Sequence, residues 1–202
     1  MPLARRGTAP AATLLTVIHR RVARRAWSAL GAVALLAACG GSTKPAGYGL
    51  GGVANGALVP VAQRQTAPAL AGPALAGGRL DVASYRGKVV ALNVYASWCA
   101  PCQAEADTVS AVADATQADG VQFVGIGYQD SALNLSAYGS RHHIHYPSLT
   151  DPDGVLVAAL TFRAPPTTYL IDKQGRVAGR VLGGVTVDGL TADLRQLAAE
   201  PA

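Results

Sequence analysis

Cysteine is scarce in this chain of 202 residues, which contains Cys39, Cys99 and Cys102 and no others. A framework of several structural disulfides is therefore excluded. The sequence also has no hydrophobic run of the length that a membrane span needs. The run from Ala26 to Ala38 covers thirteen residues, whereas a permanent transmembrane helix needs about 20.

Acidic residues are absent from residues 1–38, which carry six arginines. Without this segment, the chain has eleven Lys and Arg and twelve Asp and Glu, so the formal net charge of +5 becomes −1. The rest of the chain therefore lacks a basic patch for phosphates, and we expect no nucleic-acid partner.

The arginines followed by the apolar run are the pattern of an export signal. The run ends in Leu36-Ala37-Ala38-Cys39, which resembles a bacterial lipobox, where the cysteine receives diacylglycerol. We interpret residues 1–38 as a signal peptide and Cys39 as the lipid anchor of an extracytoplasmic protein on the bacterial cell membrane. An ordinary cleavage site nearby and an uncleaved anchor with an incidental cysteine remain open.

The next segment, residues 39–63, is rich in Gly, Ala and small polar residues and has no helical or strand periodicity. This composition predicts a flexible tether. Residues 64–202 have the pattern of one domain, long enough for a single buried core and without an internal repeat.

Two thiols lie two residues apart in Trp98-Cys99-Ala100-Pro101-Cys102, between an apolar run and an alanine-rich helical pattern. A cysteine at the start of a helix lies among unsatisfied N–H groups and at the positive end of the helix dipole, which stabilise its thiolate. Such a sulfur is a nucleophile, and a partner one turn along is placed to resolve a mixed disulfide. If Cys39 carries lipid, Cys99 and Cys102 are the two remaining cysteines. Outside the cytoplasm, such a lone close pair indicates thiol-disulfide exchange rather than a permanent disulfide.

The hydrophobic pattern of the domain predicts alternating strands and helices. A helix is expected to begin near Pro101, which suits a first helical turn, and to run to Ala118 before Asp119-Gly120. Another is expected over 131–138, ended by Gly139. The other expected elements are an edge strand within 78–85, strands at 89–95, 121–127, 167–171 and 176–182, turns at 151–154 and 172–175, and a final amphipathic helix at 187–199.

Four blocks of the chain resemble, in order, motifs of the TlpA/ResA/CcmG-like thiol-disulfide oxidoreductases, a family with the thioredoxin fold. They are GKVVALNVYASWC at 87–99, the Cys-x-x-Cys pair, DPDG at 151–154 and PTTYLID at 166–172. Tyr95 stands where the family usually has Trp. The resemblance covers about residues 64–199 and implies an α/β three-layer sandwich, with a mixed central β-sheet and helices on both faces.

By this resemblance, Cys99 is the nucleophile and the more exposed thiol, and Cys102 is the more buried resolving thiol of a redox disulfide. A permanently closed disulfide is the structural alternative. The resemblance also places a cis peptide bond before Pro166, against the sulfurs, where the Pro165 carbonyl would pair with substrate backbone; a trans Pro-Pro loop is the alternative. Trp98 would shield the sulfurs and offer an apolar surface to partners, unless it packs in the core.

Glu105 lies where ResA-like members carry a glutamate close to the thiols. It would transfer protons to and from Cys102, although an exposed helix glutamate is the simpler alternative. Asn93 stands where cytoplasmic thioredoxins keep a buried Asp, and because an amide is no base, proton transfer would shift towards Glu105. We expect no cofactor and no metal, since two thiolates leave a zinc site incomplete and the histidines at 142–145 fall in a predicted solvated loop.

The expected function is a membrane-tethered enzyme that exchanges its Cys99/Cys102 pair with client proteins containing cysteine pairs. A membrane protein would supply or accept its electrons, in cytochrome c maturation or in disulfide formation. Ala100-Pro101 is closer to the Gly-Pro of thioredoxin than to the Pro-His of DsbA, which favours a reductant. A copper-binding chaperone, using both thiolates and a histidine from 142–145, is the alternative. A peroxidase is less well supported because the Pro-x-x-x-Thr-x-x-Cys pattern is missing.

Overall fold

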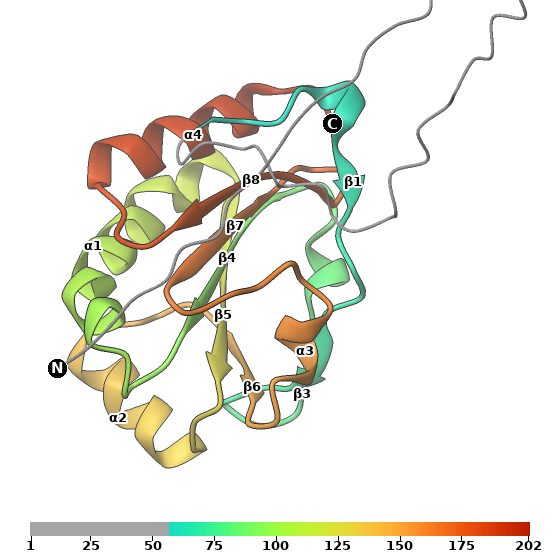
Figure 1. Cartoon of the computed structure of the whole chain (residues 1–202). Coiled ribbons are helices and arrows are strands. Elements are labelled where there is room, and N and C mark those ends of the chain that lie inside the picture. Colours follow the sequence, from blue (N-terminus) through green and yellow to red (C-terminus); the bar gives the residue numbers. More distant parts are fainter. Residues whose placement is uncertain (1–56) are drawn as a thin grey trace, which may run out of the picture. The chain divides into compact units, whose positions relative to one another are not determined.

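The central sheet has the strand order β1-β8-β7-β4-β5-β6 within residues 57–202, the part of the chain that the computed structural model describes (Figure 1). β4 (Val89–Tyr95), β5 (Val121–Tyr128) and β6 (Ser148–Asp151) are parallel to one another. β7 (Thr167–Ile171) and β8 (Arg176–Leu182) are antiparallel to their neighbours. The sheet is therefore mixed, as predicted.

Every residue of the central strand β4 is buried. A continuous apolar run suits such a strand because both faces of the sheet are covered. At the carboxyl end of β4, Tyr95 pairs with Gly127 of β5, and Val94 pairs with Thr167 of β7. This end of the sheet leads directly into the Cys-x-x-Cys segment.

Helices α1 (Ala100–Thr116), α2 (Ala132–Arg141) and α4 (Val187–Ala199) lie against the sheet, and α1 also contacts α4. α4 buries leucines at helical spacing, namely Leu190, Leu194 and Leu197. At Gly127, an added Cβ would overlap the side chain of Leu135 in α2. The glycine therefore permits the close approach of α2 to β5.

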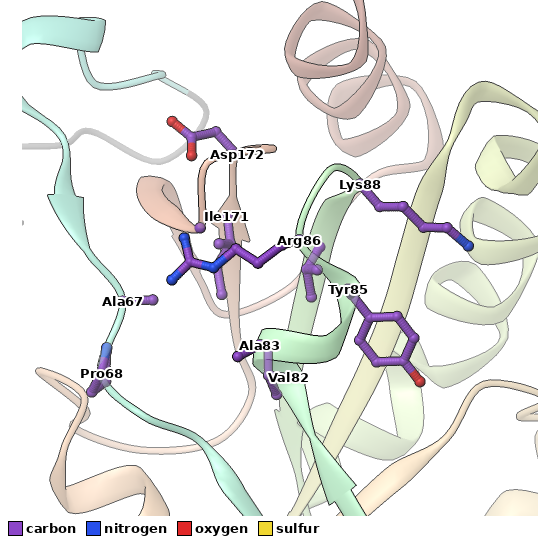
Figure 2. A pocket seen from close by; sticks show the side chains of 11 residues that line it. Ala67, Pro68, Val82, Ala83, Tyr85, Arg86, Lys88, Ile171 and Asp172 are labelled. Carbon is purple, nitrogen blue, oxygen red and sulfur yellow. The ribbon is translucent and has the colours of Figure 1, made fainter. Parts of the chain in front are cut away.

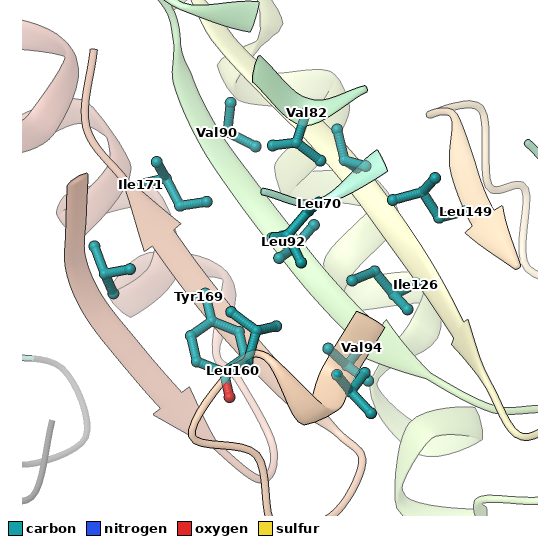
Figure 3. Packing of buried hydrophobic residues seen from close by; sticks show 13 residues of the cluster. Leu70, Val82, Val90, Leu92, Val94, Ile126, Leu149, Leu160, Tyr169 and Ile171 are labelled. Carbon is teal, nitrogen blue, oxygen red and sulfur yellow. The ribbon is translucent and has the colours of Figure 1, made fainter. Parts of the chain in front are cut away.

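The opposite face of the sheet is covered by shorter elements. They are the hairpin of β2 (Ala71–Pro73) and β3 (Arg79–Asp81), the 3₁₀ turn Val82–Tyr85 and the short helix α3 (Val155–Ala158). Apolar side chains from these elements and from the sheet form one cluster, which Figure 3 shows spread over β4, β5 and β7. Helices thus lie on both faces, but the second face carries only short helical segments among the described residues.

Three details differ from the sequence-based expectations. α2 continues through Gly139 to Arg141, because burial of Leu135 and Tyr138 outweighs the cost of about 1 kcal/mol for a glycine inside a helix. The strand expected within 78–85 ends at Asp81, whose side chain accepts from Ala83 N and begins a 3₁₀ turn. β1 (Gln65–Thr66), β2 and β6 were missed because two to four residues are too short for a periodic signal.

Residues 57–63, which we expected to be the end of the flexible tether, pack against the domain. Leu58 contacts the cluster beneath α1 and α4, and the N–H of Val59 donates to the carbonyl of Ala178 in β8 at 2.7 Å. A 3₁₀ turn follows at Val61–Gln63. The predicted signal peptide, Cys39 and most of the predicted tether lie outside the described residues. Within residues 57–202, none of the helices has the length and apolar character that crossing a membrane would take.

Candidate active site

Cys99 and Cys102 form a disulfide at the start of α1, with their Cα atoms 5.2 Å apart. Cys99 is the N-cap residue of the helix, and its sulfur accepts a hydrogen bond from Cys102 N at 3.2 Å. The sulfur thus lies at the positive end of the helix dipole, as predicted. Cys99 is 4% exposed and Cys102 is 1% exposed, so Cys99 is the more accessible of two largely buried residues.

Glu105 is buried on the same helix, one turn beyond Cys102, with 6% of its surface exposed. Its Oε2 atom is buried and has no hydrogen-bond partner among residues 57–202. Burial raises the pKa of Glu105 to about 7, although the neighbouring Val185 backbone and Asn93 side chain act in the opposite direction. A carboxyl group with this pKa can give up and take up a proton near neutral pH. The alternative of an exposed helix glutamate is wrong.

Asn93 is the polar neighbour of Glu105 on the central strand. It is buried in β4, and its Nδ2 donates to Thr168 Oγ1 at 3.0 Å. The same side chain lies close enough to Glu105 to lower its pKa, against the larger effect of burial. Because an amide does not titrate, Glu105 is the titratable group of the two.

The peptide bond between Pro165 and Pro166 is cis, as the resemblance implied. It immediately precedes β7, where Thr167 pairs with Val94 of β4. Extending this register by one pair places Pro166 beside Tyr95, at the end of the sheet that leads to Cys99. Pro165 is half-buried, and the carbonyl of Pro166 already accepts from Gly183 N at 3.1 Å.

Trp98 is 55% exposed, so it is not a core residue. Its Nε1 donates to the carbonyl of Gln129 at 3.0 Å. This bond fixes the indole at the surface, directly before Cys99.

Two further residues hold the thiol segment, and sequence reasoning did not identify either. Asp130 accepts from Ser97 N at 2.7 Å and from Ser131 N at 2.8 Å, and thereby joins the segment before Cys99 to the start of α2. Burial raises the pKa of Asp130, but these hydrogen bonds outweigh it and hold the pKa below its ordinary value. Tyr138 OH donates to the carbonyl of Cys102 at 2.8 Å. Asp130-Ser131 is a recognisable N-cap signal for α2, whereas nothing in the sequence connects Tyr138 with Cys102.

The histidine segment at 142–145 differs in part from the solvated loop that we expected. The side chain of His142 is 12% exposed, and its Nδ1 lies 2.9 Å from Asp107 Oδ1. Its ring lies 4.7 Å from that of Tyr138, between centroids. His143 and His145 are exposed. Within residues 57–202, no three His, Cys, Asp or Glu side chains are grouped to hold a metal ion.

Two cavities of the domain are not lined by either cysteine. A groove of about 670 Å³ lies beside Tyr95 and α2, and neither cysteine lines it. A small cavity of about 30 Å³ is crossed by Arg86 and bordered by Lys88 and Asp172 (Figure 2). It lies at the opposite end of β4 from the thiols, about 20 Å away along a strand of seven residues. With room for about two water molecules, it is too small for a cofactor.

The chain matches the model of the AhpC/TSA family over residues 64–180. It is 29% identical over 137 residues to the thiol-disulfide oxidoreductase ResA of Geobacillus thermodenitrificans, covering 68% of this chain and 79% of ResA. It is 36% identical over 110 residues to the thiol:disulfide interchange protein DsbE of Pseudomonas aeruginosa, covering 53% of this chain and 58% of DsbE.

A solved structure shares both the fold and part of the sequence. The secreted thiol-disulfide isomerase of Corynebacterium glutamicum superposes with a TM-score of 0.67 and 30% identity, over 71% of this chain and 91% of the isomerase. The family match includes the Cys-x-x-Cys segment and the helices α1, α2 and α3, and it ends within β8, before α4. The chain therefore belongs to the AhpC/TSA family, and its thioredoxin-like domain is similar to the thiol-disulfide oxidoreductases ResA and DsbE within the thioredoxin fold.

Proposed function

We propose that this protein is a thiol-disulfide oxidoreductase whose reacting pair is Cys99 and Cys102. The observation that carries the proposal is a disulfide at the start of a helix, beside a buried carboxyl group and a cis-proline strand. The similarity to ResA and DsbE supports the same reaction class.

Cys99 is the nucleophile in this proposal. In the reduced protein, its thiolate gains from the N–H of Cys102 and from the helix dipole. It attacks one sulfur of a client disulfide, the other client sulfur leaves as a thiolate, and Cys99 becomes covalently linked to the client. The thiolate of Cys102 then attacks Cys99 Sγ, which restores the internal disulfide and releases the reduced client.

Glu105 serves Cys102 during the second step. The Cys102 sulfur has to lose its proton before it can attack, and the buried Glu105 Oε2, one turn along the helix, is without a hydrogen-bond partner in the described part of the chain. Because the pKa of Glu105 is about 7, this carboxylate can accept the proton near neutral pH. In the opposite direction of electron flow, it returns the proton to Cys102.

Replacing Cys102 by serine tests the assignment of the two sulfurs. The Cys102→Ser variant should accumulate mixed disulfides through Cys99, visible as client adducts on non-reducing gels and as the modified Cys99 peptide in mass spectra. Cys99→Ser is the matched control and should form no adducts. Adducts on Cys99→Ser, with none on Cys102→Ser, would reverse the two roles.

The clients and the membrane anchoring are further parts of the proposal. The composition of residues 1–39 supports an extracytoplasmic lipoprotein held by Cys39. Clients are then exported proteins with cysteine pairs, and a membrane protein exchanges electrons with the Cys99/Cys102 couple. The Ala100-Pro101 dipeptide favours a reductant, as in cytochrome c maturation, and a reduction potential near the −270 mV of thioredoxin would agree with this direction.

A further inference from the structure

Trp98, which directly precedes Cys99, is the first member of a row of three aromatic rings. Its indole is held by the carbonyl of Gln129, and the N–H of Gln129 donates to the carbonyl of Asp151 at 2.9 Å. Gln129 has φ +46°, in the left-handed region. The indole of Trp98 is therefore presented to solvent in one orientation, and a partner that covers it loses little side-chain entropy.

The row continues from Trp98 through Tyr128 to Phe162. The rings of Trp98 and Tyr128 lie 6.4 Å apart, and those of Tyr128 and Phe162 lie 4.9 Å apart in an edge-on arrangement. Tyr128 and Phe162 are partly buried because they pack on the core cluster of the second sheet face. Phe162 lies in the segment that leads to the cis bond before Pro166. The row thus connects the segment before Cys99 with the segment before β7.

Charge is distributed unevenly along this row. Arg163 follows Phe162, is exposed, and makes no hydrogen bond or ion pair with the described residues. The carboxylates of Asp130 and Asp151 are already bound to backbone N–H groups. Asp153 is exposed, and the next residue, Gly154, lies beside the Tyr128 ring. The end of the row near Pro165 is therefore positive.

We propose that Trp98, Tyr128, Phe162 and Arg163 form a docking site for an unfolded segment of the client, one that carries an aromatic or long aliphatic side chain and an acidic residue near its reacting cysteine. The inference rests on the proposed exchange at Cys99. Trp98 directly precedes Cys99, so the row begins at the neighbour of the reacting residue. Large apolar side chains are most often buried in folded proteins, so an unfolded client offers them to this site more readily than a folded one.

The test uses the reduced Cys102→Ser protein and synthetic peptides whose single cysteine carries thionitrobenzoate. Cys99 attacks the peptide sulfur, thionitrobenzoate leaves, and its absorbance gives the rate. One peptide contains Phe and Asp near the cysteine, and a matched peptide has Ser at both positions. The small disulfide dithiobis-nitrobenzoate reports Cys99 reactivity without a peptide. Phe162→Ala and Arg163→Glu remove the two proposed contacts, and Val61→Ala and Arg79→Glu are the matched controls.

Phe162→Ala and Arg163→Glu should each raise the half-saturating concentration of the Phe/Asp peptide about five- to tenfold, with the limiting rate within twofold. Neither should change the reaction with the Ser peptide or the small disulfide, and the controls should match the parent protein. Equal losses on both peptides, or no loss on the Phe/Asp peptide, would overturn the docking site. Failure of the parent protein to react with the small disulfide would instead refute the proposed exchange at Cys99.

Discussion

Replacing Glu105 by glutamine keeps the size of the side chain and removes its charge. The expected effect is on stability as a function of pH. In the unfolded chain Glu105 ionises near its ordinary pKa of 4.5, whereas burial in the folded protein raises the pKa to about 7. Between these values the folded protein holds a proton that the unfolded chain releases, so the wild type loses stability as the pH rises from 4.5 to 7.

The size of this loss follows from the shift. If the whole shift acted on stability, a rise of the Glu105 pKa from 4.5 to about 7 would correspond to a loss of about 3 kcal/mol in the free energy of unfolding. Water at the edge of the site screens part of this, which leaves about 2 kcal/mol. Glu105→Gln removes the penalty, so at pH 8 it should be more stable than the wild type by about 2 kcal/mol, or about 4 to 8 °C in Tm.

Urea unfolding of both oxidised proteins between pH 4 and pH 9 measures the effect. The free energies of unfolding should agree near pH 4, where Glu105 is protonated in both states, and diverge up to pH 7. All other titrating groups are common to both proteins and cancel in the difference. Parallel pH profiles would show that Glu105 titrates normally in the folded protein, and the argument for its role as a proton carrier would fail.

Three other predictions concern the anchor and the packing around the thiols. Cys39→Ser should move the protein from the membrane fraction to the soluble fraction, whereas retention in the membrane would indicate an uncleaved anchor. Gly127→Ala should lower the free energy of urea unfolding by about 1 to 3 kcal/mol because its Cβ would overlap Leu135 of α2. Gly139→Ala, whose nearest contact outside its own helix would be Ile144 at 3.9 Å, should raise it by up to about 1 kcal/mol. Equal losses in the two variants would contradict this reasoning. Tyr138→Phe should cost about 1 kcal/mol by removing the hydrogen bond to the Cys102 carbonyl, and an unchanged urea midpoint would show that this bond contributes nothing.

Local chemistry in the sequence was sufficient for most of the fold. The apolar run at 89–95, the proline after Cys99 and the leucine spacing at 187–199 each predict their element without reference to the rest of the chain. The same holds for the reacting pair, because a Cys-x-x-Cys at the start of a helix has both its spacing and its dipole set by neighbouring residues. The exceptions were the short strands β1, β2 and β6, and the end of α2, whose extent depends on contacts made by Leu135 and Tyr138 with other elements.

The environment of the sulfurs was decided by the tertiary structure. Glu105 has its raised pKa because α1 packs against β4 and the Val185 segment, and burial is a property of all three together. The row from Trp98 to Phe162 joins residues 64 positions apart, which no local pattern records. The sequence by itself determined the Cys-x-x-Cys pair and the positions of the longer helices and strands, because these depend on neighbours along the chain. Only the packing of distant segments decided which groups surround the sulfurs and which aromatic rings lie side by side, because desolvation and contact depend on neighbours in space.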